Sequence, residues 1–132
     1  MSKDSSGLVD RRSPHTVDET VARLTDLLRN KGITLFALID HSGEATRAGL
    51  TLRPTKLLIF GNPRAGTALM QAAPRSGIDL PLKILVWQDA DGTTWVTTNG
   101  AEFLRARHDL GPDASTVLSA ADALAAAATG SA

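Results

Sequence analysis

The fold is decided by the stretch LKILVWQDADGTTWVTT, which spans residues 82–98. Residues 82–88 are apolar at most positions, and residues 93–98 consist of threonine, tryptophan and valine, which favour strands. Between them, Asp89-Ala90-Asp91-Gly92 supplies the residues of a tight hairpin turn. The stretch therefore predicts two strands that are adjacent and antiparallel.

Two further apolar runs precede this hairpin, ITLFALID at residues 33–40 and KLLIF at residues 56–60. Both are short and bounded by polar or turn residues, as strands are. Together with the hairpin they predict a four-stranded sheet.

Helical patterns alternate with the predicted strands. Thr16-Val17-Asp18-Glu19 has the spacing of a capping box, and apolar residues at helical spacing follow it up to a stop at Gly32. Further helices are expected at 42–49 with Ser42 as cap, at 67–73, at 99–108 behind a second capping box, and at 113–127. The predicted class is α+β, order α-β-α-β-α-β-β-α-α, with helices packed on a mostly antiparallel sheet.

Composition excludes several classes of function. The chain has 132 residues, 14 basic and 14 acidic side chains and no cysteine. A neutral chain without a basic excess does not favour nucleic acid or an anionic membrane as partner, and the lack of cysteine excludes thiol chemistry and cysteine-ligated metals. No cofactor is expected. Because residues 1–13 lack an apolar signal segment and no run could span a bilayer, we expect a small soluble cytoplasmic protein.

Three segments are expected along the chain. Residues 1–13 are polar and predict a disordered lead-in, and removal of residues 1–12 is expected to leave the melting temperature nearly unchanged. Residues 14–110 form the α+β domain, and residues 111–132 form an alanine-rich helix that packs on the domain or on a partner. Within the domain, apolar periodicity assigns these residues to the core: Val21, Leu24, Leu28, Leu35, Leu57, Ile59, Ile84 and Val86.

Several motifs in order resemble the bacterial and archaeal family called domain of unknown function 302. They include Ile39-Asp40-His41, AGLTLRPTK at residues 48–56, LLIFGNP at residues 57–63, DLPLK at residues 79–83 and WQDADG at residues 87–92. The resemblance covers about Thr16 to Asp109 and leaves out the alanine-rich end. It implies an α+β fold and a homodimer, and it implies no established activity.

His41 is the first candidate for chemistry because it follows a predicted strand and histidine titrates near neutral pH. With Asp40 and Glu44 beside it, His41 can act as a general base or as one metal ligand. The competing interpretation is a solvated histidine. A metal site needs three or four ligands, and neither His15 nor His108 has ligand spacing to His41, so no metal is predicted.

Asn62, Arg64 and Asp79 complete the candidate site. The segment Gly61-Asn62-Pro63-Arg64-Ala65-Gly66 before a helix can form an anion cradle, although it lacks the lysine of a P-loop. The competing interpretation is a turn in which Asn62 binds backbone and Pro63 starts the helix. Asp79 either lines the same cleft as His41 and Asn62 or pairs with Lys56, Lys83 or Arg53.

Two functions remain open at this stage. The first is a non-catalytic homodimeric module that binds a small molecule or anion near His41 and Asn62. The second is a small enzyme with a His41-centred acid/base site. The dimer is expected because the sheet is apolar on both faces and would expose Phe60, Leu85 and Trp87 unless terminal helices or a second copy cover them.

Overall fold

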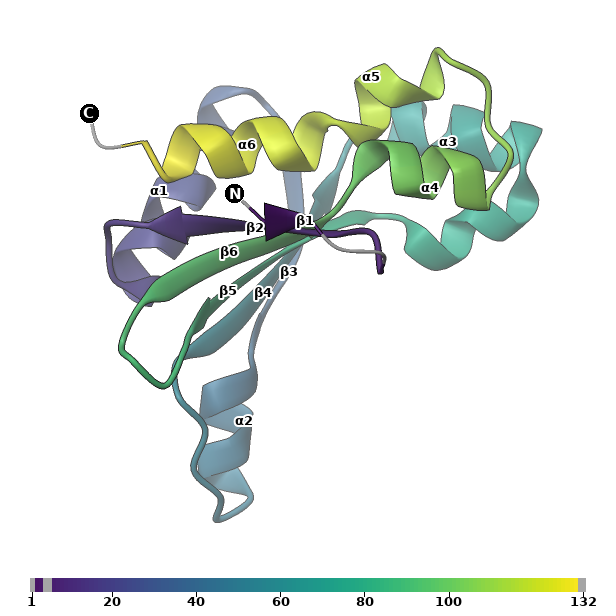
Figure 1. The fold of residues 1–132 in the computed structure, drawn as a ribbon. Coiled ribbons are helices and arrows are strands. Elements are labelled where there is room, and N and C mark those ends of the chain that lie inside the picture. The colour runs from purple at the N-terminus through teal and green to yellow at the C-terminus, as the bar shows by residue number, and fades with distance from the viewer. Residues whose placement is uncertain (1, 4–5, 131–132) are drawn as a thin grey trace.

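An antiparallel sheet forms the centre of the computed structural model, which describes residues 2–3 and 6–130 (Figure 1). Within these residues five strands have six or seven residues each, and a two-residue strand is added at one edge. The order across the sheet is β1 (Ser2–Lys3), β2 (Leu8–Ser13), β6 (Thr94–Asn99), β5 (Leu82–Gln88), β4 (Thr55–Gly61) and β3 (Thr34–Asp40). The predicted α+β class and antiparallel pairing are confirmed, but a four-stranded sheet is wrong.

Helices cover only one face of this sheet. The long helix α1 (Val17–Asn30) and the C-terminal helix α6 (Ala120–Ala128) pack on it, and α6 contacts β2, β5 and β6 of its own chain. Near one end lie α3 (Pro63–Ala72), the 3₁₀ helix η1 (Pro74–Asp79), α4 (Ala101–Arg107) and α5 (Ala114–Leu118). From the opposite end α2 (His41–Arg47) projects away from the body (Figure 1).

The capping box at the start of α1 is confirmed. The Thr16 hydroxyl accepts from the Glu19 amide at 3.1 Å, and the Glu19 carboxylate accepts from the Thr16 amide at 2.9 Å. Leu24 and Leu28, four residues apart, are 0% and 2% exposed. The apolar stripe of α1 therefore lies against the sheet, as its periodicity predicts.

The N-terminal prediction is wrong for residues 8–13, which form strand β2 against β6. Val9 is buried against the helix layer. Ser13 is also buried, and its hydroxyl forms a 2.7 Å hydrogen bond with that of Thr20. Arg11 also faces the helices, where Asp122 of α6 binds its guanidinium through both carboxylate oxygens. Because polar side chains occupy most inward positions, the strand lacks the apolar alternation that sequence patterns detect. Residues 1, 4 and 5 of the predicted lead-in lie outside the described residues.

Several helix boundaries and caps differ from the prediction. Asp40, rather than Ser42, caps α2 by accepting from the Gly43 amide at 3.0 Å. Gly100 begins α4 without a side-chain cap, since Asn99 belongs to β6 and the second capping box does not form. The alanine-rich segment is two helices, α5 and α6, separated at Ser119.

The core is confirmed in α1 and β5 but reversed in β4. Val21, Leu24, Leu28, Ile84 and Val86 are buried as predicted. In β4 the residues that face the helices are Leu58 and Phe60, which are 0% and 1% exposed. The predicted core residues Leu57 and Ile59 lie on the opposite face, and Leu35 of β3 is half-buried. When both the odd and the even positions of a strand are apolar, the sequence does not indicate which of its two faces is buried.

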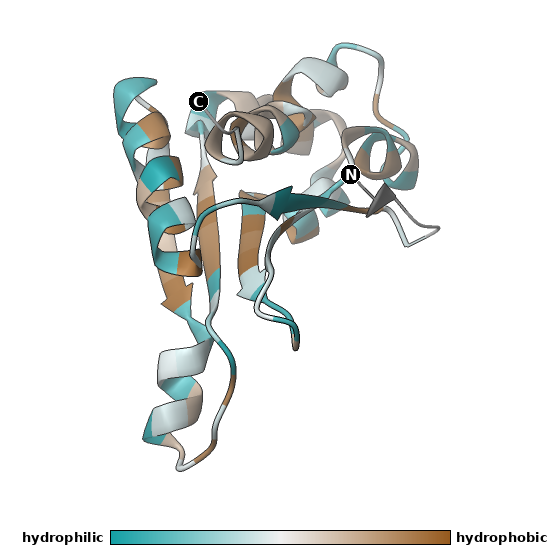
Figure 2. Cartoon of the chain, turned by 60° about the vertical axis from the view of Figure 1, so that its left-hand side comes forward, coloured by the Kyte–Doolittle hydropathy of each residue, from teal (hydrophilic) through white to brown (hydrophobic). Residues whose placement is uncertain are grey.

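The second face of the sheet carries apolar side chains, and none of the described helices covers it. Residues directly opposite each other in antiparallel strands share a face, and the register places one row of Ile39, Leu57 and Leu85 across β3, β4 and β5. A second row contains Trp87 and Trp95, whose ring centroids are 6.5 Å apart. We call this surface the open face; it comprises Ile39, Leu57, Ile59, Leu85, Trp87 and Trp95, all half-buried. Figure 2 shows that hydrophobic residues extend along the strands.

Candidate functional site

His41 and Asn62 lie at opposite ends of the sheet. Asp40, directly before His41, is paired with Lys56 near the start of β4, whereas Asn62 follows Gly61 at the end of β4. At ~3.3 Å per residue, the seven residues of β4 separate these ends by ~20 Å. The predicted cleft shared by His41 and Asn62 therefore does not exist.

His41 is exposed at the first position of α2, and within the described chain its side chain makes no hydrogen bond or ion pair. The acidic neighbours are used elsewhere: Asp40 caps α2, and Glu44 forms an ion pair with Arg47. No described group orients the imidazole. This geometry matches the solvated histidine among the two interpretations.

Asn62 is the N-cap of α3, and its side-chain oxygen accepts from the Arg64 amide at 3.0 Å. Pro63 is the first residue of the helix, so the predicted loop at residues 61–66 is shorter than expected. Arg64 is exposed and has no side-chain partner among the described residues. This turn agrees with the structural interpretation and not with an anion cradle, because the cap already satisfies an amide that would bind the anion.

Asp79 belongs to a third location, where it binds side chains of the α4 region. Its carboxylate lies 2.6 Å from His108 Nε2 and 3.1 Å from an Arg107 nitrogen. The side chain of His108 is only 8% exposed, so this contact is shielded from water. The predicted pairing of Asp79 with Lys56, Lys83 or Arg53 is wrong, and Lys56 instead binds Asp18 at 2.9 Å.

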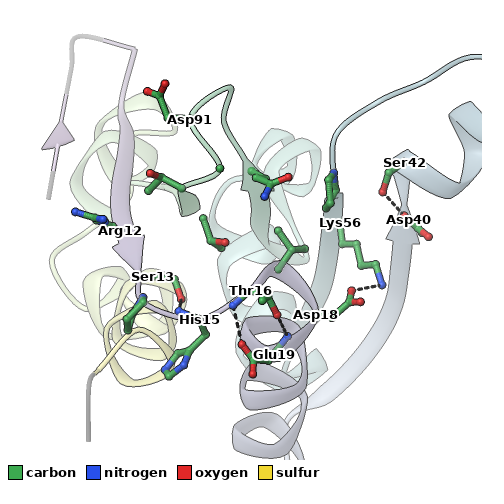
Figure 3. Close-up of a pocket in the computed structure, with 17 residues that line it drawn as sticks. Arg12, Ser13, His15, Thr16, Asp18, Glu19, Asp40, Ser42, Lys56 and Asp91 are labelled. Carbon is green, nitrogen blue, oxygen red and sulfur yellow. Dashed lines mark hydrogen bonds and ion pairs between the residues drawn. The ribbon is translucent and has the colours of Figure 1, made fainter.

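A hollow with a volume of about 810 Å³ lies where α1 begins above the sheet. Its floor contains Ser13, Thr94 and Gln88, which are adjacent in the register of β2, β6 and β5. Its other walls come from the start of α1, the start of β4 and the turn between β5 and β6. We call this hollow the polar cleft. Figure 3 shows Arg12 and Asp91 on one side and Lys56, Asp40 and Ser42 on the other.

The charge of the polar cleft is negative. Four carboxylates line it, from Asp18, Glu19, Asp40 and Asp91, against the cations of Arg12 and Lys56. Two of these carboxyls are held ionised by hydrogen bonds: the Thr16 backbone and hydroxyl lower the pKa of Glu19, and the Ser42 hydroxyl and the Gly43 amide lower that of Asp40. The cleft therefore favours a neutral or cationic polar ligand over an anion.

Sequence reasoning missed the polar cleft because its residues come from five separate stretches of the chain. Several of these residues belong to motifs that the sequence identifies, but as parts of a helix cap, a strand end or a hairpin turn and not as parts of one site. Ser13 and Arg12 lie in a strand that was predicted to be disordered. The sequence contains no spacing that would have brought these segments together.

The comparison with known families settles what kind of chain this is. The model of the family "Domain of unknown function DUF302" matches residues 9–128. The chain belongs to the DUF302 family. The match includes strand β2 and most of the alanine-rich end, so the expectation that the family pattern stops near Asp109 is wrong.

Curated relatives of this DUF302 chain carry the name of a membrane channel. "Fluoride-specific ion channel FluC 1" of Brucella suis is 45% identical over 106 residues, which are 80% of this chain and 42% of that protein. "Fluoride-specific ion channel FluC 2" of Brucella melitensis is also 45% identical, and 39% of it is covered. The chain thus spans about two fifths of the curated relatives it matches. No helix in the described residues is both long and apolar enough to cross a membrane.

A solved structure shares the DUF302 fold. The uncharacterized conserved protein DUF302 from Bacillus stearothermophilus superposes with a TM-score of 0.76 at 20% identity, over 95% of this chain and 97% of that one. At this identity the likeness concerns the fold. Within the described residues no group of three or more histidine or acidic side chains could hold a metal ion.

Proposed function

We propose that this DUF302 chain is a non-catalytic binding module that holds a small, polar, positively charged ligand in the polar cleft. The observation that carries this proposal is the excess of carboxylates over cations in a hollow of about 810 Å³, a volume typical of small-molecule sites. Asp91 is the carboxylate best placed to meet the ligand, because its side chain is exposed and has no partner within the described chain. A protonated amine is the simplest group that it would attract.

Binding without catalysis is favoured by the way the cleft's acids are used. Asp40 and Glu19 accept hydrogen bonds that lower their pKa, and a carboxylate with a lowered pKa is a weaker base. The alternative, an acid/base enzyme centred on His41, lacks a described partner that would orient the imidazole. It remains the second candidate function.

We do not assign the fluoride specificity named among the relatives to the polar cleft. Their printed name applies to whole proteins, of which this chain matches about two fifths. An anion such as fluoride would enter a hollow whose carboxylates outnumber its cations. We therefore propose that the module has a cytoplasmic location, acts beside other proteins or domains, and does not itself bind fluoride.

We further propose that the module is a homodimer in which a second copy covers the open face. The face holds six half-buried apolar side chains and no helix, and monomers rarely leave such a continuous patch in water. Both indole N–H groups on it already donate within the chain, Trp87 to the Thr97 hydroxyl and Trp95 to the Asp89 carboxylate, each at 2.8 Å. The tryptophan rings can therefore be buried without losing hydrogen bonds to water.

The polar cleft is tested by following backbone amide shifts in NMR spectra with four probes: putrescine, glycerol, sodium phosphate and sodium fluoride. Putrescine should shift amides of Thr16, Asp91 and Thr93 in a saturable manner, and Asp91→Asn should weaken that response. Asp113→Asn removes an exposed charge directly before α5, outside the cleft, and serves as the matched control. Saturable shifts of the same amides by phosphate or fluoride, with none from putrescine, would overturn the assigned ligand charge.

A further inference from the structure

A second, apolar cavity lies at the other end of the sheet, where β4 leads into α3. It has a volume of about 270 Å³ and is lined mainly by the apolar side chains of Phe36, Met70, Leu80, Pro81 and Val117. A smaller hollow of about 190 Å³ shares Gly61, Asn62, Leu82 and Val117 with it. Because Asn62 and the polar cleft lie at opposite ends of β4, this cavity is independent of the cleft.

The rim of this cavity exposes large apolar side chains to water. Phe36 is 49% exposed and Met70 is 36% exposed, although both belong to elements packed in the fold. Burying such surface under a bound molecule is favourable by about 25 cal/mol per Å². The exposed apolar rim therefore favours the binding of an apolar ligand.

One polar group on the wall is available to orient a ligand. The side-chain oxygen of Asn62 accepts from the Arg64 amide, whereas its Nδ2 has no hydrogen-bond partner within the described chain. The Thr67 hydroxyl, also on the wall, donates to the Pro63 carbonyl at 2.6 Å. The remaining donor is therefore the carboxamide N–H of Asn62, which calls for an acceptor oxygen on the ligand.

We propose that this cavity binds a small aromatic molecule that carries one hydrogen-bond acceptor, with the ring among Phe36, Met70 and Pro81 and the acceptor at Asn62 Nδ2. An apolar cavity of ~150 Å³ admits benzene, so a single substituted ring fits the observed volume. No charged side chain lines the cavity, which excludes carboxylates and phosphates as its ligands.

The glycine at position 66 allows the cavity to be filled by mutation. Gly66 lies within α3, and a Cβ built there would meet only the Met70 methyl group at 3.9 Å, an ordinary contact. Gly66→Leu should therefore fold and place its side chain in the space that the ligand needs. Ala68→Leu, on an exposed position of the same helix, is the matched control.

The test uses acetophenone and ethylbenzene, which have nearly the same shape but differ in the carbonyl acceptor, titrated into the full chain and followed by amide shifts. Acetophenone should saturate with shifts at Phe36, Asn62 and Gly66, Gly66→Leu should abolish these shifts, and Ala68→Leu should preserve them. Asn62→Asp keeps the helix cap but removes the hydrogen-bond donor. It should therefore weaken the binding of acetophenone about fivefold and leave the binding of ethylbenzene nearly unchanged. Non-saturating shifts, or binding that survives Gly66→Leu, would overturn the proposal.

Discussion

Single residues in the hairpin between β5 and β6 show how side chains stabilise a turn. The carboxylate of Asp89 accepts from the Asp91 amide at 3.0 Å, the Thr93 amide at 2.9 Å and the Trp95 indole at 2.8 Å. These hydrogen bonds, above all that of Trp95, lower the pKa of Asp89 from its usual 3.8. Sequence patterns predict this turn well, because the residues that form it are contiguous.

Acid should weaken the hairpin through Asp89. Since its pKa is lower in the folded chain, its contribution is present above the usual value of 3.8 and is lost as pH falls through the lowered folded value. We expect the thermal midpoint of the wild type to fall more steeply below pH 4 than that of Asp89→Asn, whose midpoint is lower at neutral pH. Emission from the two tryptophans, both in this hairpin, reports the loss. Parallel pH profiles for the two proteins would contradict this role.

Two neighbouring leucines of β4 test the assignment of faces. Leu58 is 0% exposed against the helices, so Leu58→Ala should cost ~2–5 kcal/mol of unfolding free energy. Leu57→Ala, on the open face, should cost clearly less when measured at a concentration too low for self-association. Chemical denaturation measures both, and equal losses would show that the two faces are equally packed.

At the scale of elements, the strands and helices 33–108 follow from contiguous patterns, whereas β2 does not. Its inward residues Arg11 and Ser13 are stabilised by Asp122 and Thr20, which lie 111 and 7 positions away. A pattern read along the chain cannot contain such partners. The same limit applies to the polar cleft, whose walls meet only after folding.

Removal of residues 1–13 provides the corresponding measurement. Because β2 pairs along the length of β6, we expect this deletion to lower the thermal midpoint by many degrees or to abolish cooperative unfolding, followed by circular dichroism. Removal of residues 1–6 leaves β2 intact and is the control. If the variant without residues 1–13 unfolds at the same temperature as the wild type, residues 1–13 are a disordered lead-in and β2 does not contribute to stability.

Helix α3 offers an independent check of its boundaries. Gly66 lies inside α3 instead of in a loop, so Gly66→Ala should raise the free energy of unfolding by about 1 kcal/mol. Urea denaturation measures the change. A decrease would indicate that residue 66 needs a glycine conformation, as the predicted loop implied.

At the scale of the whole molecule, the described helices cover one face of the sheet and leave the open face without a helix. The alanine-rich helix α6 packs on its own β2, β5 and β6, which removes it as cover for the open face. Sequence reasoning placed Leu85 and Trp87 on the second face correctly, but it also placed Phe60 there, which is buried, and it missed Leu57 and Ile59. The proposed dimer interface therefore consists of rows of residues that are defined by the strand register and not by the sequence pattern.

Sedimentation equilibrium at tens of micromolar tests the central claim, that a second copy covers the open face. The wild type should sediment with twice the 13.9 kDa mass of one chain. Leu57→Glu places a charge in the centre of the open face without entering the helix-covered core, so it should sediment as a single chain with its circular dichroism spectrum retained. A wild type with the mass of one chain, or a Leu57→Glu variant that remains folded and dimeric, would contradict the account.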